Sequence, residues 1–357
     1  MKVSTLLTIF TALVSYSSAL PIEKRETEYN SSLPLVKIYG TGGTIASRGS
    51  SASQTSGYSL GLTVEDLIES VPTLQDVANL EYLQVSNVGS GSINDTILLD
   101  LAHNIQADLD EGKVGGAVVT HGTDSLEETS FFLELTVKTE SPIVIVGAMR
   151  PATATSADGP MNLYQAVSVA GSELSKGRGS LVVFNDRIGS GFYSTKSSAN
   201  ALDTFKSLEQ GYLGFFFNND IEYYYPPARP NGYHYFNVTE STELPMVDII
   251  YAHQSMDPAL IYAAAESGVK GIVTAGMGAG SITAPARDAL NDVYEKYGVI
   301  TVQSRRMQEG KVPERANNFI GSGYLNPQKA RIMLQLCLNE GLNLNQTKDV
   351  FSAVYGG

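Results

Sequence analysis

The chain has 357 residues, of which 43% are hydrophobic and 17% are charged. This composition is that of a globular protein, and the length allows two domains that each have a core. The formal net charge is −13, which argues against nucleic acid and an anionic membrane surface as partners. The single cysteine, Cys337, excludes an intrachain disulfide and lies in an apolar run, so we expect it to be buried.

The N-terminal segment is predicted to direct the protein to the extracellular, periplasmic or cell-wall space. Residues 1–19 combine a basic start, a short apolar stretch and a small-residue end, as in a secretory signal peptide. Residues 20–25 are a possible propeptide, because Lys24-Arg25 is typical of a dibasic processing site; an ordinary charged pair in a flexible tail is the alternative. Four Asn-x-Ser/Thr acceptors favour a secreted glycoprotein. They are Asn30, Asn94, Asn237 and Asn345.

The first strand predicted after this segment covers residues 35–39, and a glycine-rich turn over 40–46 follows it directly. Three glycines let the backbone turn tightly and approach a ligand, while Thr44 presents a hydroxyl. The turn fails as a dinucleotide fingerprint because Ile45 stands where the third glycine or alanine belongs, and no P-loop lysine follows. The turn therefore offers a threonine hydroxyl at a strand end, which can act as an acyl-transfer nucleophile.

The next stretch, residues 47–59, is almost all Ser, Gly, Ala, Thr and Gln, with Tyr58 at its far end. Such composition has little to bury, so we expect a mobile loop. A capping box that starts at Thr63 predicts a helix. A strand is predicted over residues 80–88, and apolar residues at helical spacing predict a helix over 94–110.

A second strand-to-helix junction lies at residues 115–129. Its apolar half predicts a buried strand, and its acidic half predicts the first turn of a helix capped by Asp124 or Ser125. The polar cluster at 120–124 (Thr-His-Gly-Thr-Asp) therefore ends a strand, where open α/β sheets bind their ligands. A turn whose polar residues only cap the helix is the alternative.

The rest of the chain alternates strands and helices. Further strands are predicted over residues 143–146, 181–184, 271–275 and 299–303 and from Val247, and further helices over 160–176, 258–267, 284–297 and 327–341. Two such alternations predict an α/β protein with two parallel-sheet domains. We expect a larger N-terminal catalytic domain over 35–222, a linker over 223–246 and a smaller flavodoxin-like domain over 247–357.

Residues 41–46 (Thr-Gly-Gly-Thr-Ile-Ala) and 121–125 (His-Gly-Thr-Asp-Ser) together resemble the two signature motifs of bacterial-type L-asparaginases. Three more blocks resemble the same family in the same order. They are 146–151 (Val-Gly-Ala-Met-Arg-Pro), 156–160 (Ser-Ala-Asp-Gly-Pro) and 325–331 (Leu-Asn-Pro-Gln-Lys-Ala-Arg). The resemblance runs from about Leu35 to the C-terminus and is closest to a type II-like, secreted fungal or yeast form.

The resemblance implies an amidohydrolase that converts L-asparagine to L-aspartate and ammonia without metal or cofactor. It also implies a homotetramer with sites at subunit interfaces. Thr44 looks like the primary nucleophile, with Tyr58 beside it on a closing loop. Thr123 matches the second catalytic threonine, with Asp124 and Lys196 as its partners. Such a site is chemically reasonable, because hydrolysis of an amide needs an activated hydroxyl and a stabilised oxyanion.

Substrate binding is inferred from charge and from the same resemblance. Asp124 suits the α-ammonium group of asparagine, whereas the Ser90 hydroxyl and local backbone N–H groups suit its α-carboxylate. The full set of predicted substrate-binding residues is Ser90, Gly91, Thr123, Asp124, Ala148, Ser281 and Glu314. Ser281 matches a residue that the neighbouring subunit contributes. Glu314, with Glu309 as runner-up, is the candidate for the neighbour's glutamate that orients the tyrosine.

Gly91 departs from the family pattern, which usually has Gln or Glu there to hold the α-ammonium group. The absence of that Gln or Glu side chain removes a contact with the α-ammonium group that is worth about 1–3 kcal/mol if the side chain is charged. A glutaminase-asparaginase is an alternative, because one methylene discriminates by only about 1–3 kcal/mol. A catalytically inactive extracellular binding protein on the same fold is another. We expect His121 to be structural, and for Lys196 a solvated surface lysine is the alternative.

Overall fold

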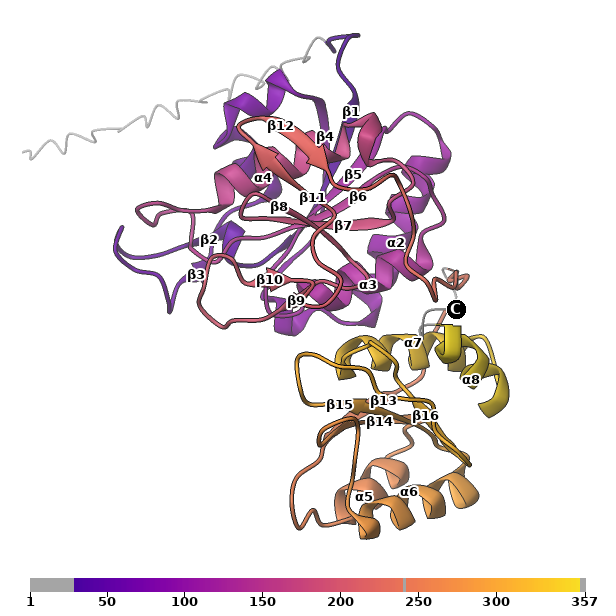
Figure 1. Ribbon diagram of the computed structural model, residues 1–357. Helices are drawn as coiled ribbons and strands as arrows, with labels where there is room; N and C mark the ends of the chain where they lie inside the picture. Colours follow the sequence, from indigo (N-terminus) through magenta and orange to yellow (C-terminus); the bar gives the residue numbers. More distant parts are fainter. Residues whose placement is uncertain (1–28, 240–241, 354–357) are drawn as a thin grey trace, which may run out of the picture. The chain divides into compact units, whose positions relative to one another are not determined.

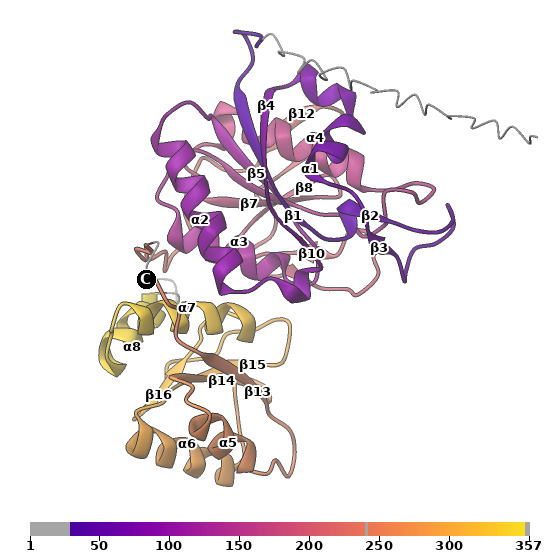
Figure 2. The ribbon, with the colours of Figure 1, turned by 180° about the vertical axis from the view of Figure 1, so that it is seen from behind.

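The computed structural model describes residues 29–239 and 242–353, and its elements are shown in Figures 1 and 2. Within these residues the larger sheet has eight strands in the order β12-β11-β8-β7-β6-β5-β1-β4. Its strands are β1 (Leu35–Gly42), β4 (Asn79–Val88), β5 (Gly116–Thr120), β6 (Ile143–Val146), β7 (Ser180–Phe184), β8 (Arg187–Ser190), β11 (Gly214–Phe217) and β12 (Asp220–Tyr223). Its helices are α1 (Val64–Glu69), α2 (Asp95–Asp110), α3 (Leu126–Thr136) and α4 (Gly159–Ala170).

The larger sheet is mixed, whereas the sequence predicted a parallel one. The strands β4, β1, β5, β6 and β7 are mutually parallel, but β8, β11 and β12 add antiparallel pairs at one edge. The cause is the turn Asn185-Asp186 between β7 and β8, whose φ angles are 51° and 62°. A two-residue turn with both φ angles positive joins antiparallel strands, and a parallel crossover needs a longer connection.

Buried side chains fill both faces of this sheet. Along β5, Val119 belongs to the core shared with α2 and α3, whereas Val118 belongs to the core shared with α1 and α4. Successive strand residues point to opposite faces, so a strand covered on both sides needs apolar residues throughout. This explains the unbroken burial of β5 and positions its carboxyl end between two helical layers.

The smaller sheet is wholly parallel in the described residues, with the order β13-β14-β15-β16. Helices α5 and α6 lie on one face and α7 and α8 on the other (Figures 1 and 2). Helix α7 also contacts α3 of the larger domain. The elements are β13 (Val247–Tyr251), α5 (Ala259–Glu266), β14 (Gly271–Gly276), α6 (Ala284–Tyr297), β15 (Ile300–Arg305), β16 (Phe319–Gly321), α7 (Pro327–Asn339) and α8 (Leu344–Ala353). The predicted α/β class with a larger and a smaller domain is confirmed.

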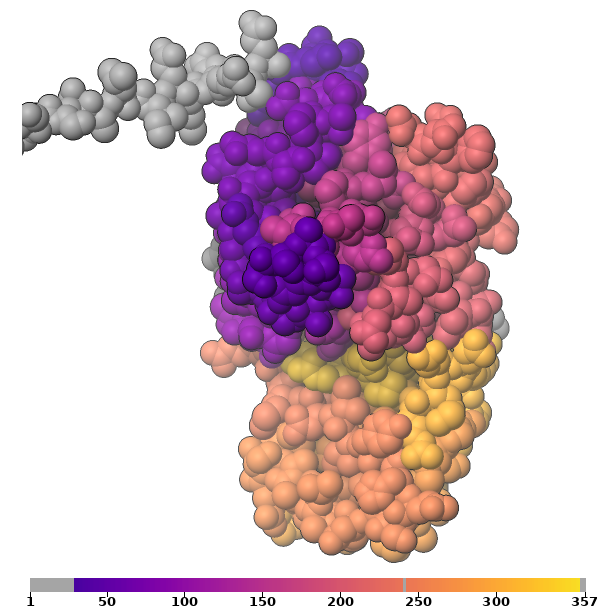
Figure 3. All heavy atoms as spheres, turned by 90° about the vertical axis from the view of Figure 1, so that its left-hand side faces the viewer, coloured from indigo at the N-terminus to yellow at the C-terminus, as the bar shows by residue number. Residues whose placement is uncertain are grey.

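Short strands flank two loops that matter for the site. Strands β2 (Ser47–Arg48) and β3 (Ser59–Leu60) pair at the base of the serine-rich loop, which is therefore a hairpin. Figure 3 shows this hairpin in dark indigo on the surface of the larger domain. Strands β9 (Thr195–Lys196) and β10 (Phe205–Lys206) form a second small ladder.

Several local predictions can be compared with the structure. The capping box of Thr63 is confirmed, and Asn94 caps α2 by accepting from the backbone N–H of Ile97. Cys337 is buried. Strands β8, β11, β12 and β16 were not predicted, because such short strands carry little hydrophobic alternation. Helix α8 was not predicted either.

Candidate active site

Four loops meet at the carboxyl edge of the larger sheet. The strands β4, β1, β5 and β6 are neighbours, and the loops that follow them carry Ser90, Thr44, Thr123 and Ala148, in that order. Residues that lie far apart in the sequence are thereby brought to one edge of the sheet. This is the location at which open α/β sheets bind ligands.

Glycines allow these loops to come into backbone contact. Gly43 has φ of 86°, and a Cβ there would collide with the backbone of Gly122. A Cβ on Gly122 would lie 2.8 Å from Cβ of Ser90. Gly43 and Gly122 therefore let the two signature loops touch backbone to backbone, and Gly122 leaves room for the side chain of Ser90 from the loop after β4.

Thr44 is paired with Tyr58. Thr44 starts a short 3-10 helix directly after β1, and its Oγ1 lies 2.9 Å from the phenolic oxygen of Tyr58. Either hydroxyl can donate in this bond. Both residues are partly buried, so a ligand can reach the pair. The hairpin that carries Tyr58 thus delivers a titratable group to the first threonine.

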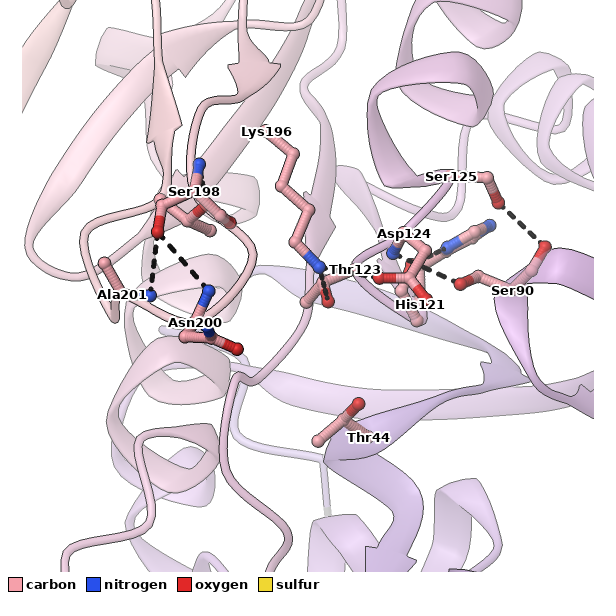
Figure 4. Close-up of polar contacts among 12 residues, drawn as sticks. Thr44, Ser90, His121, Thr123, Asp124, Ser125, Lys196, Ser198, Asn200 and Ala201 are labelled. Carbon is pink, nitrogen blue, oxygen red and sulfur yellow. Dashed lines mark hydrogen bonds and ion pairs between the residues drawn. The ribbon is translucent and has the colours of Figure 1, made fainter. Parts of the chain in front are cut away.

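Thr123 is paired with Lys196. The ammonium group of Lys196 donates to Oγ1 of Thr123 at 2.9 Å and to Oδ1 of Asp124 at 2.7 Å. The Lys196 side chain is 14% exposed, whereas that of Asp124 is 81% exposed. In Figure 4, Lys196 extends to both residues, and Thr44 lies nearby on its own loop. The solvated-lysine alternative is therefore wrong, and the Asp124 carboxylate remains open to a cationic ligand.

Ser90 links the loop after β4 to the loop after β5. Its Oγ accepts from the Asp124 backbone N–H at 3.2 Å, and its carbonyl accepts from Oγ of Ser125 at 2.8 Å. Ser125 occupies the cap position of α3 but makes no side-chain cap hydrogen bond, and Asp124 is bound to Lys196. The prediction that one of these two side chains caps α3 is wrong, because each is engaged elsewhere.

His121 stabilises the loop that carries Thr123. Its ring is fully buried, with Nδ1 2.7 Å from the Gly122 carbonyl oxygen and Nε2 2.8 Å from Oγ1 of Thr129. A carbonyl oxygen accepts only, so Nδ1 carries the proton and Nε2 accepts from the threonine. Burial lowers the pKa of His121 to about 4, against the weaker opposing effect of the Gly122 hydrogen bond. A neutral, fully bonded ring is suited to support rather than to proton transfer.

The loop after β6 packs against the loop that carries Thr123. A Cβ on Gly147 would lie 2.7 Å from the carbonyl oxygen of His121 and 3.2 Å from Cγ2 of Thr123. The next residue, Ala148, is fully buried. Beyond it, the carboxylate of Asp158 accepts from the backbone N–H groups of residues 149 and 150, which fixes the course of the loop.

The remaining predicted residues do not join this group. Gly91 is exposed and follows Ser90, and a Cβ there would meet nothing within 4 Å. Ser281, Glu309 and Glu314 are exposed residues of the smaller domain. Among the described residues, no hydrogen bond or ion pair connects any of these three to Thr44 or Thr123.

Sequence reasoning missed a set of polar side chains near Lys196. Asn326 is half-buried and donates from Nδ2 to Oε2 of Glu127 at 2.9 Å and to Oγ1 of Thr195 at 3.3 Å. Lys329, in the first turn of α7, is buried. Their block was recognised only as a family motif; the available signal was a lysine within the otherwise apolar face of a helix. In the described part of the chain, no group of three or more His, Cys, Asp or Glu side chains is arranged to hold a metal ion.

Comparison with known families agrees with this architecture. Residues 35–229 match the family model described as "Asparaginase, N-terminal", and residues 246–351 match the "Glutaminase/Asparaginase C-terminal domain". The chain belongs to the asparaginase family. Among its relatives, L-asparaginase 2-3 of Saccharomyces cerevisiae is 57% identical over 358 residues, which cover 99% of this chain and 98% of the relative.

Bacterial asparaginases are similar over nearly the same length. L-asparaginase 2 of Bacillus subtilis is 44% identical, with 95% of this chain and 96% of the relative covered. L-asparaginase 2 of Escherichia coli is 43% identical, with 90% and 93% covered. A solved structure, described as a probable cytoplasmic L-asparaginase from Campylobacter jejuni, superposes with a TM-score of 0.85 at 37% identity and covers 89% of this chain and 99% of that chain.

The last comparison contradicts the predicted location. We expected a secreted protein in an extracellular, periplasmic or cell-wall space. This expectation is wrong, because the similar protein from Campylobacter jejuni is described as a probable cytoplasmic L-asparaginase. The expectation rested on the signal-peptide, propeptide and dibasic interpretations of residues 1–25, which lie outside the described residues. Over residues 29–239 and 242–353, no helix combines the length and apolar character needed to cross a membrane.

Proposed function

We propose that this asparaginase-family chain hydrolyses L-asparagine to L-aspartate and ammonia, with Thr44 as the nucleophile. The observation that carries the proposal is the meeting of two threonine hydroxyls at one sheet edge, each bonded to a titratable partner, Tyr58 or Lys196. The names of the relatives, which are L-asparaginases, support the same substrate.

In the proposed first step, the Oγ1 of Thr44 attacks the side-chain amide carbon of asparagine. Tyr58, whose oxygen is 2.9 Å away, takes the threonine proton while its own phenolic proton moves to the amide nitrogen. The carbonyl oxygen becomes an oxyanion, which backbone N–H groups near Thr123 and the positive end of α3 stabilise. Collapse of this intermediate breaks the carbon–nitrogen bond, and the nitrogen, which has received the proton relayed through Tyr58, departs as ammonia. The product of this step is an aspartyl ester on Thr44.

In the second step, water attacks the ester carbon and Thr44 regains its proton as aspartate leaves. Thr123, held by Lys196, lies where it can orient this water and pass protons through the ammonium group. Asp124 balances the positive charge of Lys196 at 2.7 Å. The pair therefore supports proton transfer without leaving a buried cation uncompensated.

Substrate recognition follows from the charges around the threonines. The exposed carboxylate of Asp124 suits the α-ammonium group. The hydroxyl of Ser90 accepts from the Asp124 backbone, so its own hydrogen is available to the α-carboxylate. The carbonyl of Ala148, at the end of the β6 loop, is the proposed acceptor for the amide NH2 group.

The assembly and the domain limits are part of the same proposal. We propose a homotetramer in which Ser281 and Glu314 of one subunit complete the site of another, with Glu309 as the second candidate for the glutamate. Their exposure in the smaller domain supports such a role. The proposed domains cover residues 35–222 and 247–357 with a linker between them, and the two matched family segments support this division.

The decisive experiment measures ammonia released from L-asparagine by the purified protein and by two variants. Thr44→Ala and Thr123→Ala should each abolish turnover while the circular dichroism spectrum stays unchanged. Thr96→Ala, on α2, is the matched control. Retention of more than about a tenth of the wild-type kcat/KM, equivalent to a loss below about 1.4 kcal/mol, would contradict the role of that threonine. Absence of ammonia with the wild type would favour a binding protein on this fold.

A further inference from the structure

Lys196 reaches the site from a short ladder, so the position of its ammonium group depends on the chain just before it. Residues 191–195 form a tight turn after β8, in which the backbone N–H groups of Tyr193 and Ser194 both donate to the carbonyl of Ser190. β9 then contributes only Thr195 and Lys196. A two-residue strand cannot by itself hold a long lysine side chain in one place.

Lys329 of the smaller domain binds the same turn. The Nζ of Lys329 donates to three backbone carbonyls, those of Gly191 at 3.2 Å, Phe192 at 2.6 Å and Ser194 at 2.7 Å. An ammonium group has three hydrogens, so all its donors are used on one turn. The last of these carbonyls belongs to the second residue before Lys196.

Asn326 connects both halves of the Lys196–Thr123 pair. Its side-chain amide donates to Oγ1 of Thr195, the residue before Lys196, and to Oε2 of Glu127. Glu127 is 3% exposed and lies in the first turn of α3, four residues after Thr123. One amide group therefore spans the strand that carries the lysine and the helix that follows the threonine.

The stability of α7 does not explain Lys329. A cation in the first turn of a helix opposes the helix dipole, and a buried ammonium group is costly to desolvate. Lys329 is 2% exposed, and burial lowers its pKa to about 8, although the carboxylates of Glu127 and Glu134 counteract this. Buried ionic groups are retained in some proteins because they specify one arrangement of the surrounding chain.

We propose that Lys329 and Asn326 are positioning residues that hold Lys196 at hydrogen-bonding distance from Thr123. The smaller domain then takes part in the chemistry of its own chain, through the turn at 191–195 and through the start of α3. This inference rests on the proposed role of Lys196 and Thr123 in asparagine hydrolysis.

Two variants test the inference. Asn326→Ser keeps an oxygen that can cap α7 but removes both amide hydrogen bonds. Lys329→Met keeps the length of the side chain but removes all three donors. Each should lower kcat about tenfold or more with little change in KM, because a small displacement of a catalytic group costs this much. Each should also shift the midpoints of the kcat–pH profile, since each change displaces Lys196, the group proposed to transfer protons.

Gln335→Met is the matched control. Gln335 is another buried polar residue of α7, and its amide donates to Asp95 and to the carbonyl of Pro245. It should lower thermal stability and leave both kcat and the pH profile of the folded protein unchanged. If Asn326→Ser and Lys329→Met behave like this control, their role is structural and the inference is overturned.

The failure of the inference can be distinguished from failure of the proposed function. If the wild type releases no ammonia, or Lys196→Met keeps the wild-type kcat, the proposed function or the role of Lys196 fails, and the inference falls with it. If Lys196→Met is inactive but folded Asn326→Ser has the wild-type kcat and pH profile, only the inference is wrong. If Lys329→Met does not fold, Asn326→Ser decides alone.

Discussion

Gly91 is the residue from which we predict the preference between asparagine and glutamine. Nothing lies within 4 Å of a Cβ built on it, and its φ is outside the range that disfavours other residues. The structure therefore does not require glycine at this position. A side chain added here would extend from the residue next to Ser90, whose Oγ accepts from the Asp124 backbone N–H.

We expect a clear preference for asparagine over glutamine, which Gly91→Gln should reduce. Without an anchor at this position, less remote binding energy is available to hold glutamine, whose amide lies one methylene further away, in a strained pose. The variant should raise kcat/KM for glutamine more than for asparagine, by about fivefold if the new contact contributes about 1 kcal/mol. The measurement is kcat/KM for both substrates on both proteins. A wild type that hydrolyses both equally well would contradict the argument.

His121 should make stability depend on pH in the acidic range. Burial lowers its pKa from 6.5 to about 4 in the folded protein, so the unfolded chain binds the extra proton first as the pH falls. Its contribution is complete above pH 6.5 and is lost towards pH 4, a change on the order of 3 kcal/mol. Urea unfolding across this range should give a flatter pH dependence for His121→Asn than for the wild type. His253→Asn, at an exposed histidine, is the control, and parallel curves for wild type and His121→Asn would exclude this account.

At the scale of elements, the side chain of Gln54 links the two halves of the hairpin between β2 and β3. The Oε1 of Gln54 accepts from the backbone and hydroxyl of Ser50, and its Nε2 donates to the carbonyls of Ser56 at 2.8 Å and Gly57 at 2.9 Å. The next residue along is Tyr58, the partner of Thr44. Order in the hairpin is thus coupled to the geometry of the first threonine.

We expect saturating aspartate to slow proteolysis of this hairpin, because closure over a ligand excludes water and orders the loop. Gln54→Ala should speed cleavage in the free protein, since it removes partly exposed hydrogen bonds worth about 1–3 kcal/mol together. Limited proteolysis with and without aspartate, followed by mass spectrometry, measures both effects. Equal cleavage rates of the wild type in the two conditions would show that the hairpin does not respond to ligand.

At the scale of the whole molecule, the candidate site divides between two kinds of residue. Two sets, Thr44 with Tyr58 and Lys196 with Thr123 and Asp124, are each held together by hydrogen bonds within one chain. Ser281 and Glu314 are exposed in the smaller domain of that chain. A homo-oligomer in which these two residues face a neighbour's threonines would account for both groups.

Mixed oligomers test this arrangement. Thr44→Ala and Glu314→Gln should each be inactive alone, whereas subunits mixed and reassembled at equal amounts should recover about a quarter of the wild-type activity, because half of the pairs are mixed and have one intact site of two. Glu309→Gln is the control and should retain activity by itself. No recovery in verified mixed oligomers would mean that Glu314 does not complete a neighbouring site.

The sequence by itself determined the α/β class, most helix limits and the two threonine loops. These properties are local, because hydrophobic periodicity, capping residues and glycine turns act over a few neighbouring residues. The capping box at Thr63 and the glycine turn before Thr44 are examples. Both were predictable because their partners lie within a few positions along the chain.

Only the tertiary structure decided which distant groups meet. The sequence alone does not show that Lys196 contacts Thr123, 73 positions away, or that Asn326 contacts Glu127, 199 positions away. It also placed Asp124 or Ser125 as a helix cap, whereas the fold binds one to Lys196 and the other to Ser90. Such contacts depend on strand order and domain packing, and a polar side chain takes whichever partner the packed chain brings within about 3 Å.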